Sequence, residues 1–492
     1  MVKQENTKCH KNTVIKGFNE STQESAKIGP NTHYDLCDTR MSAFGGLFAL
    51  IKFLDFVKFR DIFNDYFHSP TRRSRYGCYT MVMGLVVLLF VGFSRLGHFA
   101  YMRRDAMICG MLQVSILPAI STFWRYLMSL TLNHSDCFLN IGAVLRSRVW
   151  QACDLDYRVV CIDIDTTVST VYGNIEGSRK GHNPHHRGKK GLRPVLFFIE
   201  QTREYLFGTL RRGIPMNDKE VAKLIGKIGR YLPSTIKQVI IRGDAEFLGG
   251  DTIAMCRKCG YDFIFGNNSF APKFEEKKWY SKGEFDYNDT IHESRKWKQS
   301  YRFVVMRMVK EEEDEAKQLD LFTDVRYKYR VFATSLLWPS HAVIRKYDKR
   351  ADAENLIGES QKEGICAIPS KRFLSNHVFF QIVMLTYNIW RLLKIEASYR
   401  HGIEQSNENQ QEKVQTKVDF HLEDHTIRIA RLKVLFVPAK ITKHQRVEKV
   451  TYSSHDERSA GLCDLLAYLD QRREVGIMWF DNVPLNKYRI VT

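Results

Sequence analysis

Val159 to Val168, which reads VVCIDIDTTV, carries the strongest structural signal in this sequence. Its β-branched and apolar residues predict a buried strand. Asp163 and Asp165 are two residues apart, so they lie on the same face of that strand. A buried carboxylate costs several kcal/mol unless something compensates it. Because two such acids repel each other, a bound cation is the simplest compensation; for a single Asp, backbone donors or an Arg would serve.

The residues that follow predict a mixed α/β sheet. Strands are expected at 193–199, 204–210, 237–242 and 261–265, with one helix from 217 to 231 and another ending at 259. A short polar turn joins the strands at 193–199 and 204–210, which predicts a three-strand meander that starts with the Asp165 strand. The strand at 237–242 runs straight into Gly243 and Asp244, so each of the two acid-bearing strands ends at a loop.

The patterning also predicts a division into domains. The expected parts are a flexible arm at 1–35, an all-α N-terminal region for DNA binding or dimerisation at 36–150, a catalytic α/β domain at 151–266 and 336–400, a β-rich insertion at 267–335, and a linker with a basic C-terminal region at 401–492. The most apolar run, 81–93, is shorter than the ~20 residues that span a bilayer, so it predicts a buried helix and no membrane association.

The charge balance favours a polyanionic partner. Lys and Arg together number 74 against 55 Asp and Glu, a formal net charge of +19. Nucleic acid is the first candidate and an anionic membrane surface the second, beside the alternative of a merely basic soluble protein. The 11 cysteines are odd in number and irregularly spaced, which predicts reduced thiols in a cytoplasmic protein.

A basic segment lies beside the acidic strand. Between Gly173 and Arg193 the only acid is Glu176, and the segment is expected to be a loop. Such a concentration of positive charge is typical of phosphate contact, with a solvated charge run as the alternative. The cations of the segment are Arg179, Lys180, Arg187, Lys189, Lys190 and Arg193.

A third acid stands in a helical pattern further along. Tyr347, Arg350 and Glu354 are spaced by three and four residues, so one face of a single helix would carry them. By themselves they are equally consistent with a solvated face. Together with Asp165 and Asp244, however, Glu354 would complete a set of three carboxylates. Carboxylates are the ligands that Mg²⁺ or Mn²⁺ prefers, and two such ions can stabilise both oxygens of a phosphodiester displacement.

At these residues the sequence resembles the insertion-sequence DDE transposases. The resemblance rests on Ile-Asp-Thr-Thr at 164–167, Arg-Gly-Asp at 242–244 and Tyr-x-x-Arg-x-x-x-Glu at 347–354. It points to the bacterial subgroup with a Tyr-Arg-Glu-Lys signature and a β insertion before the last acid. It implies a ribonuclease-H-like catalytic domain, two divalent metal ions held by Asp165, Asp244 and Glu354, and Tyr347 and Arg350 near DNA phosphates.

The resemblance further implies what the protein does. A transposase of this kind binds the terminal inverted repeats of its element as a dimer on double-stranded DNA, cuts, and joins the 3′ ends to target DNA. One residue departs from the signature, because the expected Lys falls at Gln361, beside Lys362. Two alternatives therefore stay open: a catalytically inactive DNA-binding regulator or domesticated copy, and a ribonuclease-H-like nuclease without strand transfer.

Overall fold

The computed structural model describes residues 28–70, 75–181, 183, 186–268, 272–294, 299–309, 327–407, 422 and 425–481. Its contacts divide the chain into two units, Met1–Thr39 and Arg40–Thr492. In the first unit, the described residues 28–39 contain a turn at Pro30 and no helix or strand. Every element named below belongs to the second unit.

The second unit begins with a short strand and a series of helices. The strand β1 (Arg40–Ser42) pairs with β14 (Ala439–His444), which pairs with β15 (Val447–Tyr452). The region predicted to be all-helical therefore contains a strand, and this strand joins it to the C-terminal part of the chain. The main helices are α1 (Leu47–Phe56), α2 (Phe59–Tyr66), α3 (Cys78–Phe90), α4 (Phe99–Met102), α5 (Ala106–Met111), α6 (Ile120–Ser129) and α7 (Leu132–Ala152).

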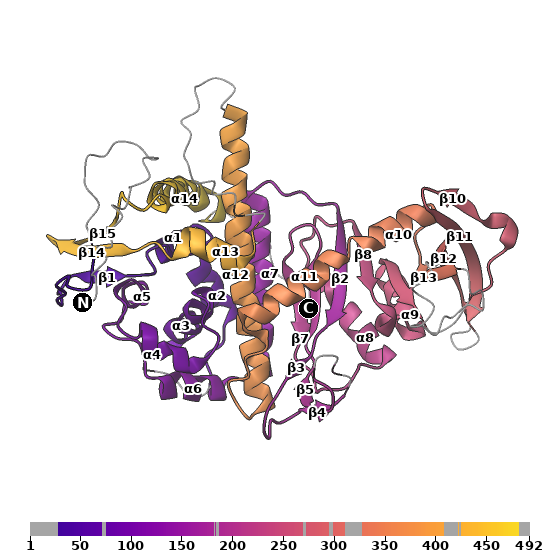
Figure 1. Ribbon diagram of the computed structural model, residues 1–492, viewed down its shortest axis with the longest axis horizontal. Coiled ribbons are helices and arrows are strands. Elements are labelled where there is room, and N and C mark those ends of the chain that lie inside the picture. Colours follow the sequence, from indigo (N-terminus) through magenta and orange to yellow (C-terminus); the bar gives the residue numbers. More distant parts are fainter. Residues whose placement is uncertain are drawn as a thin grey trace, which may run out of the picture. The chain divides into compact units, whose positions relative to one another are not determined.

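Nine of the described strands form one mixed sheet, in the order β10-β11-β12-β13-β9-β8-β2-β6-β7 (Figure 1). The predicted meander is present as β2 (Val159–Thr166), β6 (Val195–Ile199) and β7 (Tyr205–Thr209). β8 (Gln238–Gly243) lies parallel to β2, and β9 (Asp262–Asn267) lies parallel to β8. Parallel neighbours need a crossover connection, and α9 (Gly250–Cys259) provides the one between β8 and β9, packed against α8 (Asp218–Ile225).

The predicted β-rich insertion extends this same sheet. It contains β10 (Tyr280–Lys282), β11 (Phe285–Ser294), β12 (Gln299–Val309) and β13 (Tyr327–Thr334). These strands pair antiparallel in sequence order, and β13 then pairs with β9. The acidic run at 311–315 lies outside the described residues. The insertion therefore lengthens the sheet on the side away from β7.

The two faces of the sheet are covered by different helices. Cys161 of β2 and Ile240 of β8 pack in one apolar cluster with Val343 and Ile344 of α10 (Ser340–Asp348). Side chains alternate along a strand, so Asp163 and Asp165 share the face of Cys161, and Arg242 shares the face of Ile240. The acidic positions of the sheet therefore lie on the face that α10 covers.

A long buried helix connects the N-terminal helices to the sheet. In α12 (Phe373–Asn407), Trp390 stacks on Phe90 of α3 with ring centroids 4.0 Å apart. Asn388 accepts a hydrogen bond from the backbone N–H of Tyr205 at 2.9 Å and donates one to its carbonyl at 2.7 Å. Residues 373–400 are long and apolar enough to cross a membrane, but 94% of the most apolar window is buried inside the protein. α12 is therefore a core helix in this structure (Figure 1).

A buried ion pair ties the two central strands together. Asp163 and Arg242 face each other in the register of β2 and β8. The guanidinium donates two hydrogen bonds of 2.7 Å to the carboxylate, and Arg242 is fully buried. Arg242 also donates to the carbonyl of Lys346 in α10. Asp163 therefore has an Arg partner, which is one of the solutions expected for a single buried Asp.

Removing one side of this pair should destabilise the fold. Arg242→Met leaves the Asp163 carboxyl group buried without its partner, so the free energy of unfolding should fall by roughly 3–5 kcal/mol. Arg158→Met is the matched control, because the pair between Arg158 and Asp156 is exposed and should be worth about 1 kcal/mol or less. Urea denaturation followed by circular dichroism measures both. Equal midpoints for the two variants would contradict a structural role for the buried pair.

Candidate functional site

Asp165 and Asp244 lie at the same end of the sheet. Asp165 is the last residue but one of β2, and Asp244 directly follows β8. Since the two strands are parallel neighbours, their carboxyl ends coincide. The carboxylate of Asp165 accepts the backbone N–H of Thr166 at 2.7 Å, and that of Asp244 accepts the N–H of Glu246 at 3.0 Å. Both side chains are thus held at the strand ends by their own backbone turns.

Glu354 approaches this pair from α11 (Ala351–Ser360), which packs on β2. The pKa of Asp165 indicates that Glu354 lies nearby. Burial raises the pKa of Asp165 to about 6; the positive charge of Arg350 opposes this rise, and the negative charges of Asp244 and Glu354 add to it. Each of the other two carboxylates therefore lies close enough to Asp165 to change its protonation, with Glu354 on the solvent side of the three.

The segment that carries Tyr347, Arg350 and Glu354 differs from the single helix expected. α10 ends at Asp348 and α11 begins at Ala351, so Tyr347 and Glu354 lie on separate helices. The prediction of one shared helical face was wrong. The sequence contains no Gly or Pro at the break. The break lets Arg350 turn inward, where its guanidinium lies 3.1 Å from the Asp165 carboxylate and donates to the carbonyl of Ile164 at 3.3 Å.

Tyr347 reaches the same site from α10. Its ring packs on Phe332 with centroids 4.4 Å apart. Burial raises the pKa of Tyr347, the charge of Arg350 lowers it, and the charge of Asp244 raises it. A Cβ atom at Gly266 of β9 would lie 3.4 Å from the Tyr347 hydroxyl and 3.3 Å from the backbone nitrogen of Ala245. Tyr347 and Arg350 therefore both lie beside the acids, although they reach them from two helices and not from one shared face.

The basic residues predicted to contact DNA fall into two groups. Arg187, Lys189 and Lys190 are exposed. Arg193, in contrast, is buried, and its guanidinium donates to Glu246 at 2.5 Å and to the Thr166 hydroxyl at 3.0 Å. The expected loop between 173 and 193 also carries two strands, β4 (Arg179–Lys180) and β5 (Lys190–Leu192), which form a small sheet with β3 (Ser169–Thr170). That part of the loop prediction was wrong.

Glu246 is a site carboxylate that the sequence reasoning missed. One carboxylate oxygen binds Arg193 and Thr166, while the other is buried without a hydrogen-bond partner among the described residues. The available signal was Asp244-Ala245-Glu246, two acids two residues apart after a strand. That signal is weak because an isolated turn gives no reason for the second acid to face the sheet.

Gln361, where the signature Lys was expected, lies against the end of β2. Its amide donates a hydrogen bond to the hydroxyl of Thr167, two residues after Asp165. Gln361 begins a π-helical turn (Gln361–Ile365), and the neighbouring Lys362 is exposed. The residue that departs from the signature therefore still contacts the strand that carries Asp165.

The three carboxylates have the chemistry of a hard-cation site. Oxygen donors are what Mg²⁺ or Mn²⁺ takes, and a cation would offset both the burial of the Asp165 carboxylate and the repulsion from Asp244 and Glu354, which together raise the pKa of Asp165. Within the ranges that the structure describes, no three His, Cys, Asp or Glu side chains are arranged to hold a metal ion. Arg350 supplies the positive charge at Asp165 instead. The three carboxylates are suitable ligands for a divalent ion, but in this structure the guanidinium of Arg350 occupies the position beside Asp165.

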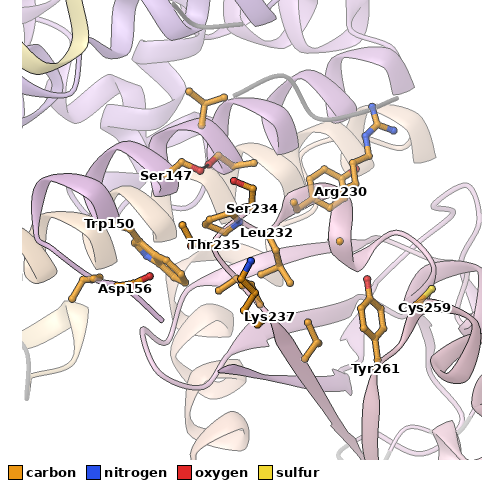
Figure 2. A pocket seen from close by; sticks show the side chains of 18 of the residues that line it. Ser147, Trp150, Asp156, Arg230, Leu232, Ser234, Thr235, Lys237, Cys259 and Tyr261 are labelled. Carbon is orange, nitrogen blue, oxygen red and sulfur yellow. Dashed lines mark hydrogen bonds between the residues drawn. The ribbon is translucent and has the colours of Figure 1, made fainter. Parts of the chain in front are cut away.

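A hollow with a volume of about 1310 Å³ lies elsewhere, between α7 and the segment that precedes β8 (Figure 2). Its lining includes Lys237 and Tyr261, which come just before β8 and β9. The acids follow the opposite ends of the parallel strands, so this hollow is separate from them. Its two acidic lining residues are engaged, Asp154 by the hydroxyl of Tyr399 and Asp156 by Arg158.

Comparison with known proteins identifies the family. Residues 37–474 match the family described as "Transposase DDE domain group 1". A cryo-EM structure of a piggyBac transposase synaptic complex with hairpin DNA is similar at 11% sequence identity and a TM-score of 0.40, over 90% of this chain and 92% of that one. No curated protein matches the sequence. Because the family match covers most of the sequence, this chain belongs to the group 1 family of DDE transposases.

Proposed function

We propose that this transposase cuts DNA by metal-dependent phosphoryl transfer at Asp165, Asp244 and Glu354. One observation carries the proposal: three segments that are far apart in the sequence bring these carboxylates close enough for Asp244 and Glu354 to raise the pKa of Asp165. A carboxylate with a perturbed pKa that lies beside other acids is typical of catalytic sites. The antiparallel meander followed by two parallel strands supports a ribonuclease-H-like catalytic domain.

The proposed cofactor is a pair of Mg²⁺ or Mn²⁺ ions held by the three acids. When bound, such ions lower the pKa of water and stabilise the attacking and leaving oxygens of a phosphodiester. The protein's own contribution is positioning and charge. Arg350 would neutralise Asp165 until DNA and metal bind, and could then pair with a phosphate, for which its planar fork is suited. Tyr347 would support the same phosphates.

The proposed substrate is double-stranded DNA at the ends of the transposon, bound by a homodimer, with joining of the 3′ ends to a target. Arg187, Lys189 and Lys190 would contact phosphates, because they are exposed and concentrated in one short segment. The helices between 36 and 150 and the basic region after 401 would supply further DNA or dimer contacts. A bacterial cytoplasmic location, on the nucleoid, is part of the same proposal.

Loss of a single proposed ligand should abolish cutting. Asp244→Asn and Glu354→Gln should each lower Mg²⁺-dependent cleavage of a duplex that contains an element end by more than ~100-fold, since even indirect partners of metal ligands are worth 10–100-fold. Binding of the duplex should persist. Asp352→Asn is the matched control on α11, because Asp352 is exposed and lies 3.9 Å from Arg203. Full cleavage by Asp244→Asn would rule out the proposed acids. If the wild-type protein cuts DNA but does not join the 3′ ends to a target, the protein is a nuclease without strand transfer.

Gln361 favours a second candidate function, a DNA-binding regulator without catalysis, because it replaces the cation of the signature. If the signature Lys contacts a DNA phosphate, Gln361→Lys should restore that contact. The slope of log K for DNA binding against log salt concentration should then steepen by about 0.9, the contribution of one phosphate contact. Fluorescence anisotropy at several salt concentrations measures it. The control is Lys362→Gln, which should change nothing. Weaker binding by Lys362→Gln, with no gain from Gln361→Lys, would instead assign the contact to Lys362.

A further inference from the structure

Three cations from separate segments line one hollow next to the small sheet. The hollow has a volume of about 360 Å³, and Arg179 of β4, Lys190 of β5 and Arg212 from the segment after β7 all line it. We refer to these three residues and the space between them as the basic hollow. Arg212 lies outside the basic segment that the sequence singled out, and it is held there by a backbone bridge to Leu192.

Glycines allow the three segments to approach so closely. A Cβ atom at Gly213, next to Arg212, would lie 2.2 Å from the carbonyl oxygen of Gly191 and 2.8 Å from that of Arg179. A Cβ atom at Gly181 would lie 2.3 Å from the carbonyl oxygen of Gly213. Any larger residue would force these backbones apart. The glycines therefore determine that the three cations share one hollow.

This arrangement concentrates positive charge, which one acid in the lining offsets only in part. Lys190 lies directly opposite Lys180 in the pairing of β4 and β5, and like charges opposite each other destabilise a sheet. The acid in the lining, Glu176, accepts a hydrogen bond from the backbone N–H of Phe373 at 2.9 Å. Arg179, Lys190 and Arg212 are exposed, and none forms an ion pair with another described residue. An anion in the hollow would offset the repulsion.

We propose that the basic hollow binds a phosphate group of the same DNA duplex that the acids cut. Gly191 pairs with Thr170, five residues after Asp165, and five extended residues span at most ~18 Å. That separation is about five base pairs at ~3.4 Å each, so one duplex can reach both places. The inference rests on the proposed function and adds Arg212 and the glycine packing to the DNA-binding surface.

Gly213→Ala tests the packing without changing any charge. The added methyl group should separate Arg212 from Lys190. The slope of log K for duplex binding against log salt concentration should then decrease by at least ~0.9, because one phosphate contact is lost. Gly110→Ala in α5 is the matched control, since nothing lies within 4 Å of a Cβ atom there. A Gly213→Ala protein with wild-type melting temperature and wild-type DNA binding would overturn the role of the glycines.

A charge variant keeps the proposal testable if Gly213→Ala does not fold. Arg179→Gln/Lys190→Gln/Arg212→Gln should lower the slope of log K against log salt concentration, for binding to a 40-base-pair duplex, by about 0.9, because the one phosphate contact of the hollow is lost. The charge-conserving Arg179→Lys/Lys190→Arg/Arg212→Lys should keep it. An unchanged slope in the Gln variant would overturn the basic hollow, and with it Lys190 as a phosphate contact, but not the proposed catalytic acids. A wild-type protein that binds no duplex would instead contradict the proposed transposase function.

Discussion

The buried ion pair between Asp163 and Arg242 is the interaction on which the site depends. It fixes β2 against β8 two residues before Asp165 and Asp244, so the two carboxylates emerge at the same end of the sheet. The same guanidinium donates to the Lys346 carbonyl, which holds α10 over this face. Because α10 leads directly into Arg350, one buried side chain positions both the acids and the residues that approach them.

Positive and negative charges around the Asp163–Arg242 ion pair are arranged in two different ways. Close to the acids, each buried arginine has a carboxylate partner: Arg350 with Asp165, and Arg193 with Glu246. Further out, in the basic hollow, cations are exposed and without acidic partners among the described residues. A buried charge must be paired because it has lost its hydration, whereas an exposed cation remains hydrated and available to a polyanion. The first arrangement suits a site that awaits a cation, and the second suits DNA.

Much of the sheet could be predicted because its signals are local. β-branched segments separated by turn residues located β2, β6, β7, β8 and β9 to within a few residues. The Arg partner expected for a single buried Asp is present at Asp163. The break between α10 and α11 was missed because no Gly or Pro marks it in the sequence. In the structure, the break coincides with the ion pair between Arg350 and Asp165, which are far apart in the chain. The same limit explains Arg193, whose partner Glu246 lies 53 residues away.

The sequence by itself determined the family and located the central strands of the sheet, since both depend on residue type and spacing along the chain. The same signals predict Asp165, Asp244 and Glu354 as the catalytic acids. Tertiary structure alone decided which charges neutralise one another. Pairing of Arg350 with Asp165, of Arg193 with Glu246, and the contact of Gln361 with Thr167 all join distant segments. So does the convergence of Arg179, Lys190 and Arg212, because glycine backbones in three segments must touch before those side chains can meet.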